Sequence, residues 1–303
     1  MSTEPISIHF SSGSLTALNI CLAIIMFGVA LDIQWSHFTQ LTKQKKAVAT
    51  GLFSQFILLP LITVIIIACL PLPTGIALGM LLVACCPGGN VSNFFTQLAR
   101  GHVALSVTLT AFSSLAAFII TPVSFFLWSA LLPSLSSEIK TFEVDFVSLM
   151  INMVAILLIP LIAGMWVASK FPAFSKKIAS PIRLLSMLML TGFIVIAVLN
   201  NQEGFSAYLG DVFWIVLLHN GSGLLGAYYF SAALKNEETV NRTVAIETGI
   251  QNSGLGLILI FNFFGGNTAM AVVAAWWGVW HLISGFAFAA FVRTRPTVQI
   301  IQS

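Results

Sequence analysis

Long apolar blocks alternate with short polar connections along this chain of 303 residues. The blocks run for about 18 residues or more, without the apolar–polar alternation of membrane β-barrels. The pattern predicts an all-α polytopic membrane protein. The nine predicted spans are 14–33, 47–70, 74–98, 103–133, 145–169, 180–200, 209–234, 240–264 and 267–292. No connection is long enough to separate soluble domains, so residues 1–303 are expected to form a single membrane domain.

The composition excludes a soluble protein, and the basic residues predict the direction of insertion. Hydrophobic residues make up 58% of the chain and charged residues only 8%, whereas soluble domains carry roughly 25% charged residues. With the N-terminus outside, every Lys and Arg except Lys140 falls in an inner loop, tail or span end. We therefore expect an inner (plasma) membrane protein with a cytoplasmic C-terminus. The net charge of +3 implies no nucleic-acid partner, and no obligate protein partner is evident.

Two of the predicted spans contain polar, helix-breaking segments. The third span meets Pro87, Gly88 and Gly89, where proline removes a backbone donor and glycine loosens the backbone. The eighth span contains the polar, glycine-marked run 245–254. Irregular backbone at membrane depth is tolerated only where it lines a cavity or is buried in protein. If spans 1–4 and 6–9 are inverted repeats, each break is the third span of its half, a pattern typical of transporter binding sites.

Glu247 is the one acidic residue that lies deep within a predicted span. An ionised carboxylate there costs several kcal/mol, and no Lys or Arg occurs in the interior of a span to offset that cost. A proton, a bound cation or a water-filled cavity would each remove it. A protonated Glu247 that only bonds neighbouring backbone is the alternative without a transport role.

Side-chain oxygens gather in the sequence around both breaks, and Ser106 and Thr110 stand four residues apart on one helix face. The oxygens come from Gln55, Ser92, Asn93, Ser106, Thr110, Thr248, Gln251, Asn252 and Ser253. Oxygen ligands without thiolates or an imidazole cluster suit a hard cation. Carbonyls freed at helix breaks add ligands for Na⁺ or H⁺. The free N–H groups of half-helix N-termini also favour an anionic substrate.

Two stretches resemble the signatures of the bile acid:sodium symporter (BASS) family. The run Pro87-Gly88-Gly89-Asn90-Val91-Ser92-Asn93, with Leu98-Ala99-Arg100-Gly101 and Ala104-Leu105-Ser106 after it, is similar to the first signature. The run Glu247-Thr248-Gly249-Ile250-Gln251-Asn252 is similar to the second. The similarity extends from about Leu15 to Arg295. The chain resembles the nine-span form found in the mammalian bile acid carriers. It is expected to be a bacterial homologue that lacks the first helix of the ten-span members.

The resemblance implies a fold in which two broken helices cross in a core domain, 47–133 and 209–292, packed against a panel domain, 14–33 and 145–200. It also implies two sodium ions. The first sodium set is Ser92, Asn93, Ser106, Thr110 and Glu247. The second is Gln55, Glu247 and Gln251 with the carbonyls of Thr248 and Ile250. Substrate groups are expected at Asn90, Asn252 and His281; Leu282 stands where some relatives carry Asn.

The sequence is therefore interpreted as that of a sodium-coupled symporter that imports a small organic anion by alternating access. The anion is expected to be bile-acid-like, or a carboxylate or sulfonate. The alternative is a proton-coupled organic anion transporter or exchanger with Glu247 as the proton carrier. An intramembrane enzyme would need a nucleophile–base pair or a metal cluster, and one deep carboxylate with two separated histidines offers neither.

Overall fold

The computed structural model describes residues 12–31, 33, 44–89, 91–142, 146–200 and 202–294, and its elements are helices. They are α1 (Ser12–Ala30), α4 (Lys45–Phe53), η1 (Ser54–Leu58), α5 (Leu59–Cys69), α6 (Thr74–Cys85), α7 (Val91–Leu98), α8 (Val103–Ser129), α9 (Pro133–Thr141), α10 (Phe146–Met153), η2 (Val154–Leu158), α11 (Ile159–Lys170), α12 (Pro172–Asn200), α13 (Gln202–Ala233), α14 (Glu238–Gly249), α15 (Ser253–Phe263) and α16 (Thr268–Arg293). Within these ranges, the β-type pairing is a single bridge between Gly88 and Gln251.

The distribution of side chains is that of a membrane protein. Four stretches among the described residues are long and apolar enough to cross a bilayer: Lys45–Cys69, Val103–Ser129, Phe146–Lys170 and Thr268–Arg293. Large apolar side chains such as Ile151 and Leu188 are more than 60% exposed, whereas Gln55, Ser106 and Glu247 are buried. Because apolar groups face outward and polar groups inward, the surface suits lipid, and the chain is an integral membrane protein.

Both predicted interruptions are present, and each follows from local chemistry. Helix α6 ends at Cys85, Cys86 is extended (φ −72°, ψ 158°), and Pro87 lies next in the chain. Helix α14 ends at Gly249, and Ile250 leaves the helical region (φ −99°, ψ 95°). Helix α15 restarts after Asn252, whose side-chain oxygen accepts a hydrogen bond from the Leu255 N–H at 3.1 Å. This is an N-cap, and it fixes where the second half-helix begins.

Two helices contain a π-helical turn where the sequence alone predicts regular α-helix. The turn η1 lies between α4 and α5, and η2 lies between α10 and α11. Pro60 and Pro160 each stand second in the helix that follows. A proline cannot donate to the preceding turn, which favours a rearranged turn there, although α8 and α12 contain Pro122 and Pro181 within regular α-helix. The η1 turn buries Gln55, and such turns are frequent at functional sites.

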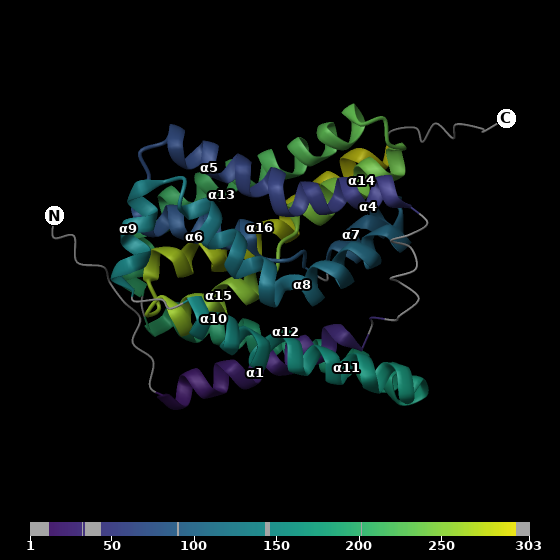
Figure 1. Ribbon diagram of the computed structural model, residues 1–303, viewed down its shortest axis with the longest axis horizontal. Helices are drawn as coiled ribbons and strands as arrows, with labels where there is room; N and C mark the ends of the chain where they lie inside the picture. The colour runs from purple at the N-terminus through teal and green to yellow at the C-terminus, as the bar shows by residue number, and fades with distance from the viewer. Residues whose placement is uncertain are drawn as a thin grey trace.

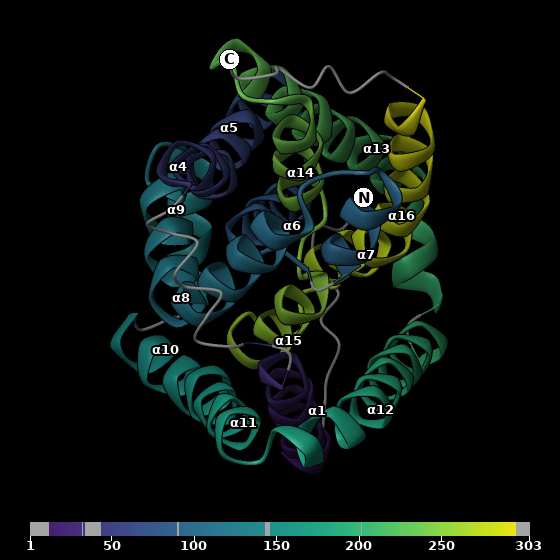
Figure 2. The same ribbon diagram turned by 90° about the vertical axis from the view of Figure 1, so that its right-hand side faces the viewer.

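The helices form two groups that lie one above the other (Figures 1 and 2). Helices α1, α10, α11 and α12 make the lower group, in which α1 packs against α11 and α12. That contact is close, since a Cβ added at Gly164 would lie 2.6 Å from the Phe27 carbonyl oxygen. In the upper group α6, α13 and α15 each pack against α16, and α14 packs against α13. Both broken helices belong to the upper group.

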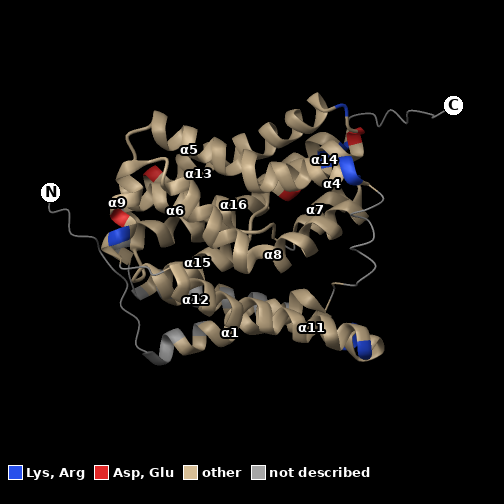
Figure 3. Cartoon of the chain, in the orientation of Figure 1, with Lys and Arg blue, Asp and Glu red and all other residues tan. Residues whose placement is uncertain are grey.

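Apart from the buried Glu247, the charged side chains that the structure describes lie toward the two ends of the bundle (Figure 3). Lys and Arg gather at the end where α4 and α14 lie and at the far end of α11. Helix α9, at the opposite end, carries Lys140 in its last turn. The long middle zone is otherwise uncharged, as a hydrocarbon layer requires.

Two predicted boundaries need correction, and proline accounts for both of them. The span predicted at 103–133 ends earlier, at Ser129, because Pro133 starts the separate helix α9. The span predicted at 180–200 begins earlier, at Pro172, since proline at the first position is compatible with a helix. The break predicted within span 74–98 is confirmed, since this span forms the two helices α6 and α7.

Candidate functional site

The two breaks meet and hold each other by backbone hydrogen bonds. The Gly89 N–H donates to the Ile250 carbonyl at 2.8 Å, and the Asn252 N–H donates to the Pro87 carbonyl at 2.9 Å. A Cβ at Gly89 would lie 3.0 Å from the Gln251 carbonyl oxygen, a tight contact, so glycine favours this close approach of the two backbone segments. The pairing satisfies backbone groups that the broken helices leave free.

The Glu247 carboxylate lies where three helices converge, and hydroxyl groups surround it. Ser92 Oγ on α7 donates to Oε1 at 2.5 Å, and Ser106 Oγ on α8 bonds the same oxygen. Thr110 Oγ1, one turn further along α8, donates to Oε2 at 2.9 Å. Glu247 is 2% exposed, and no Lys or Arg among the described residues pairs with it. A proton or a bound cation is left to balance the buried charge.

Asn93 completes this group of oxygens. Its Oδ1 lies 2.9 Å from Ser106 Oγ, while Ser92 Oγ lies 3.2 Å from Thr110 Oγ1. Each hydroxyl has a single proton but lies beside two oxygens. The cluster therefore holds more acceptors than its own protons can satisfy, which is the composition of a site for a hard cation. The structure brings together all five residues of the predicted first sodium set.

The second predicted sodium set is brought together only in part, and its two glutamines bond to each other. Gln55 Nε2 donates to Gln251 Oε1 at 2.9 Å, and Gln251 Nε2 donates to Gln55 Oε1 at 3.2 Å. Gln251 Nε2 also lies 2.6 Å from the Thr248 carbonyl, and the Ile250 carbonyl accepts the Gly89 N–H. The Glu247 oxygens bond to the hydroxyl groups of Ser92, Ser106 and Thr110.

Two of the three predicted substrate residues, Asn252 and His281, lie within the described part of the chain. Asn252 is half-buried, and its side chain caps α15. His281 on α16 is buried, and within the described residues its Nδ1 has no hydrogen-bond partner. Asn90 lies outside the described residues. His281 therefore offers a free ring nitrogen, whereas Asn252 already has a structural role.

Several residues of the crossing were not singled out from the sequence. Ser54, in the η1 turn, accepts a hydrogen bond from Thr248 Oγ1 at 2.9 Å. Asn220 on α13 donates to the Gly249 carbonyl at 2.7 Å, next to the second break. The signal for both was present: a polar residue inside an apolar span. His219, the residue before Asn220, is packed on Trp277, and its Nε2 lies 2.6 Å from Thr63 Oγ1. Its Nδ1, like that of His281, has no hydrogen-bond partner within the described residues.

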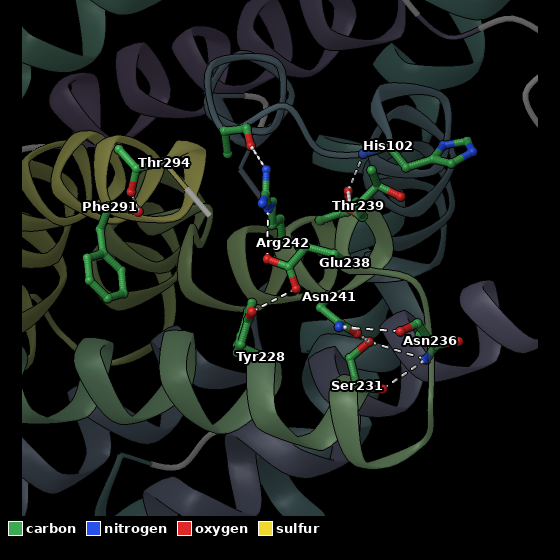
Figure 4. Close-up of polar contacts among 12 residues, drawn as sticks. His102, Tyr228, Ser231, Asn236, Glu238, Thr239, Asn241, Arg242, Phe291 and Thr294 are labelled. Atoms are coloured by element: carbon green, nitrogen blue, oxygen red, sulfur yellow. Dashed lines mark hydrogen bonds and ion pairs between the residues drawn. The ribbon is translucent and has the colours of Figure 1, made fainter. Parts of the chain in front are cut away.

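Arg242 fixes the start of α14 against the end of α7 (Figure 4). Its guanidinium is fully buried, pairs with Glu238 at 2.9 Å and donates to the Ala99 carbonyl at 3.0 Å. Tyr228 donates to the second oxygen of Glu238 at 2.7 Å. Arg242 lies one and a half turns before Glu247, so this network holds both broken helices in register beside the oxygen cluster.

Comparison with known proteins gives a consistent result. Residues 19–207 match the Sodium Bile acid symporter family. The chain is 35% identical over 277 residues to the uncharacterized sodium-dependent transporter YocS of Bacillus subtilis. The aligned residues cover 90% of this chain and 82% of YocS. The chain is 31% identical over 275 residues to the probable sodium/metabolite cotransporter BASS2, chloroplastic, of Oryza sativa subsp. japonica, covering 90% of this chain and 63% of that protein.

A more distant relative is the P3 protein of Mus musculus. The chain is 30% identical to it over 258 residues, which is 83% of this chain and 52% of P3. The chain thus spans about half the length of P3 and somewhat less than two thirds of the rice protein.

Proposed function

Since the chain belongs to the sodium bile acid symporter family, we propose that it couples sodium to the import of a small organic anion. The family consists of transporters, so the chain is a membrane transporter for a small molecule and is not an enzyme. The observation that carries the sodium proposal is the buried Glu247 carboxylate among four oxygen-bearing side chains, with no Lys or Arg of the described residues paired to it.

Two sodium ions are proposed for the two halves of the crossing. The first would bind at Ser92, Asn93, Ser106, Thr110 and Glu247, whose oxygens are already adjacent. The second would bind at Gln55 and Gln251 with Glu247 and the carbonyls of Thr248 and Ile250. The hydrogen bonds between Gln55 and Gln251 would break, so that the side-chain oxygens of both residues face the second sodium ion. This rearrangement would link sodium binding to the backbone segments that pair at the crossing.

Transport would proceed by alternating access in a nine-span fold with inverted repeats. The upper group of helices corresponds to the proposed core, 47–133 and 209–292, and the lower group to the proposed panel, 14–33 and 145–200. Movement of one against the other would open the crossing to each side in turn. The basic end is assigned to the cytoplasm of the plasma membrane, with the N-terminus outside.

The substrate is proposed to be a bile-acid-like anion, or a small carboxylate or sulfonate. Asn90, Asn252 and the free nitrogen of His281 would meet its polar groups near the crossing. Two sodium ions with one monovalent anion would carry one net positive charge inward. An inside-negative potential would then favour uptake by about 2.3 kcal/mol per 100 mV.

The test uses purified protein, thermal unfolding and a panel of organic anions in matched NaCl, KCl and choline chloride. We expect Na⁺ to raise the unfolding temperature and to increase the stabilisation given by a cognate anion. Equal stabilisation in K⁺ would refute sodium coupling. The purified protein is also reconstituted into liposomes, and uptake of the anion is measured. Uptake that follows a pH gradient without sodium would instead establish the proton-coupled alternative with Glu247 as the proton carrier.

A further inference from the structure

A cavity of about 410 Å³ opens at the basic end of the molecule, away from the helix crossing. It is lined by Phe94, Gln97, Leu98, Arg100 and Arg293. The first four come from the end of α7 and the turn after it, and Arg293 is in the last turn of α16. The lining contains two guanidinium groups and no carboxylate. Neither arginine forms an ion pair within the described residues.

Arg100 stands in a backbone position that an arginine rarely occupies. Its φ is +55°, and the Arg100 and Gly101 N–H groups donate to the carbonyls of Gln97 and Thr96. This is the left-handed turn that ends many helices, and glycine is the usual residue there. The helix dipole favours a basic residue nearby, but one in the last turn would serve without a positive φ. Lys235 has a similar φ of +56° and lies outside the cavity, so it is the place of Arg100 in the cavity lining, and not the backbone strain, that marks this side chain.

The cavity continues into an apolar surface. The Phe94 side chain is 52% exposed, and its ring lies edge-on to that of Phe286, 6.0 Å away and also 52% exposed. Aromatic rings beside a pair of arginines, at the end of a membrane-spanning helix, reproduce the division between acyl chains and headgroups in a lipid leaflet. Guanidinium groups bind phosphate oxygens in pairs, with good geometry.

We propose that this cavity binds the phosphate headgroup of an anionic phospholipid, with Arg100 and Arg293 holding the phosphate and Phe94 contacting the acyl chains. The lipid belongs to the leaflet at the basic end of the bundle. The site rests against the ends of α7 and α16, and α7 carries Ser92 at its other end, so the lipid braces a helix that forms the oxygen cluster.

The left-handed backbone supplies a test in which loss of charge does not damage the fold. Arg100→Gly places the favoured residue at that φ, so the variant should fold at least as well as the parent. Lys235 is its matched control. It is exposed, has a φ of +56° in the equivalent turn after α13, and does not line the cavity. Lys235→Gly therefore removes the same charge and the same strain at the same end of the molecule.

The full chain, purified in neutral detergent, is titrated with phosphatidylglycerol and with phosphatidylcholine, and bound lipid is counted by native mass spectrometry. We expect phosphatidylglycerol to be preferred, and the preference to fall about five-fold in Arg100→Gly and in Arg293→Gln. Lys235→Gly should keep it. An equal fall in Lys235→Gly, or none in Arg100→Gly, would overturn the proposal. Displacement of the lipid by millimolar inorganic phosphate would overturn the proposal of a lipid site and show that the cavity binds soluble phosphate.

Discussion

Ser92 Oγ and Glu247 Oε1 lie 2.5 Å apart although 155 residues separate them in the chain. The contact joins the first turn of α7 to the last turns of α14, the two half-helices that flank the crossing. A hydroxyl donor at this distance stabilises an ionised carboxylate. The relationship places the Glu247 carboxylate in a cage of oxygens that the proposed cation would complete, and the predictions below follow from it.

Replacing Glu247 by Gln should remove the response to sodium and leave the protein folded. The amide keeps the size of the side chain and can still accept hydrogen bonds from the surrounding hydroxyls, but it carries no charge to attract a cation. The measurement is the unfolding temperature in NaCl against KCl. A variant that is still stabilised by Na⁺ as strongly as the parent would show that the ion binds elsewhere.

Replacing Ser106 by Ala should weaken the sodium response, because it deletes an oxygen that touches both Glu247 and Asn93. An interaction with a charged group contributes about 1.5–3 kcal/mol, so half-maximal stabilisation should need about 10-fold more sodium or beyond. Ser113→Ala is the matched control on α8, since Ser113 Oγ bonds only the Thr110 carbonyl of its own helix. Comparable sodium requirements in the two variants would contradict the cage.

Replacing Gln251 by Ala should remove the second proposed sodium site and leave the first. The change removes the reciprocal amide pair with Gln55 and leaves the hydroxyl cluster of Glu247 in place. If two ions act together, transport or stabilisation should depend on sodium with a Hill coefficient above 1 in the parent. The coefficient should fall to about 1 in the variant. A single-ion parent curve would remove the second site from the proposal.

Replacing Gly89 by Ala should destabilise the crossing. The new Cβ would lie 3.0 Å from the Gln251 carbonyl oxygen, which is backbone and cannot rotate away. Overpacking of this kind costs about 1–3 kcal/mol, and the unfolding temperature should fall accordingly. Gly256→Ala is the control inside α15, where a Cβ finds its nearest neighbour at 3.6 Å. That substitution should leave the unfolding temperature unchanged or raise it, since alanine favours a helix.

The sequence was sufficient for the features whose causes are local. Pro87 and the glycines beside it must interrupt a helix wherever it lies, and Glu247 is costly in any apolar span, so both were recognised without coordinates. The positions of Ser106 and Thr110 on one face follow from helix periodicity alone. The bounds of α8 and α12 were less accurate, because proline both ends and begins helices.

Only the tertiary structure decided which distant groups meet. It placed Ser92 and Thr110 on the two oxygens of Glu247, turned Gln55 and Gln251 toward each other, and buried Arg242 against the Ala99 carbonyl. It also set Arg100 beside Arg293 around one cavity. These contacts depend on the angles at which helices cross, and crossing angles arise from packing over the whole bundle, which no local pattern in the sequence records.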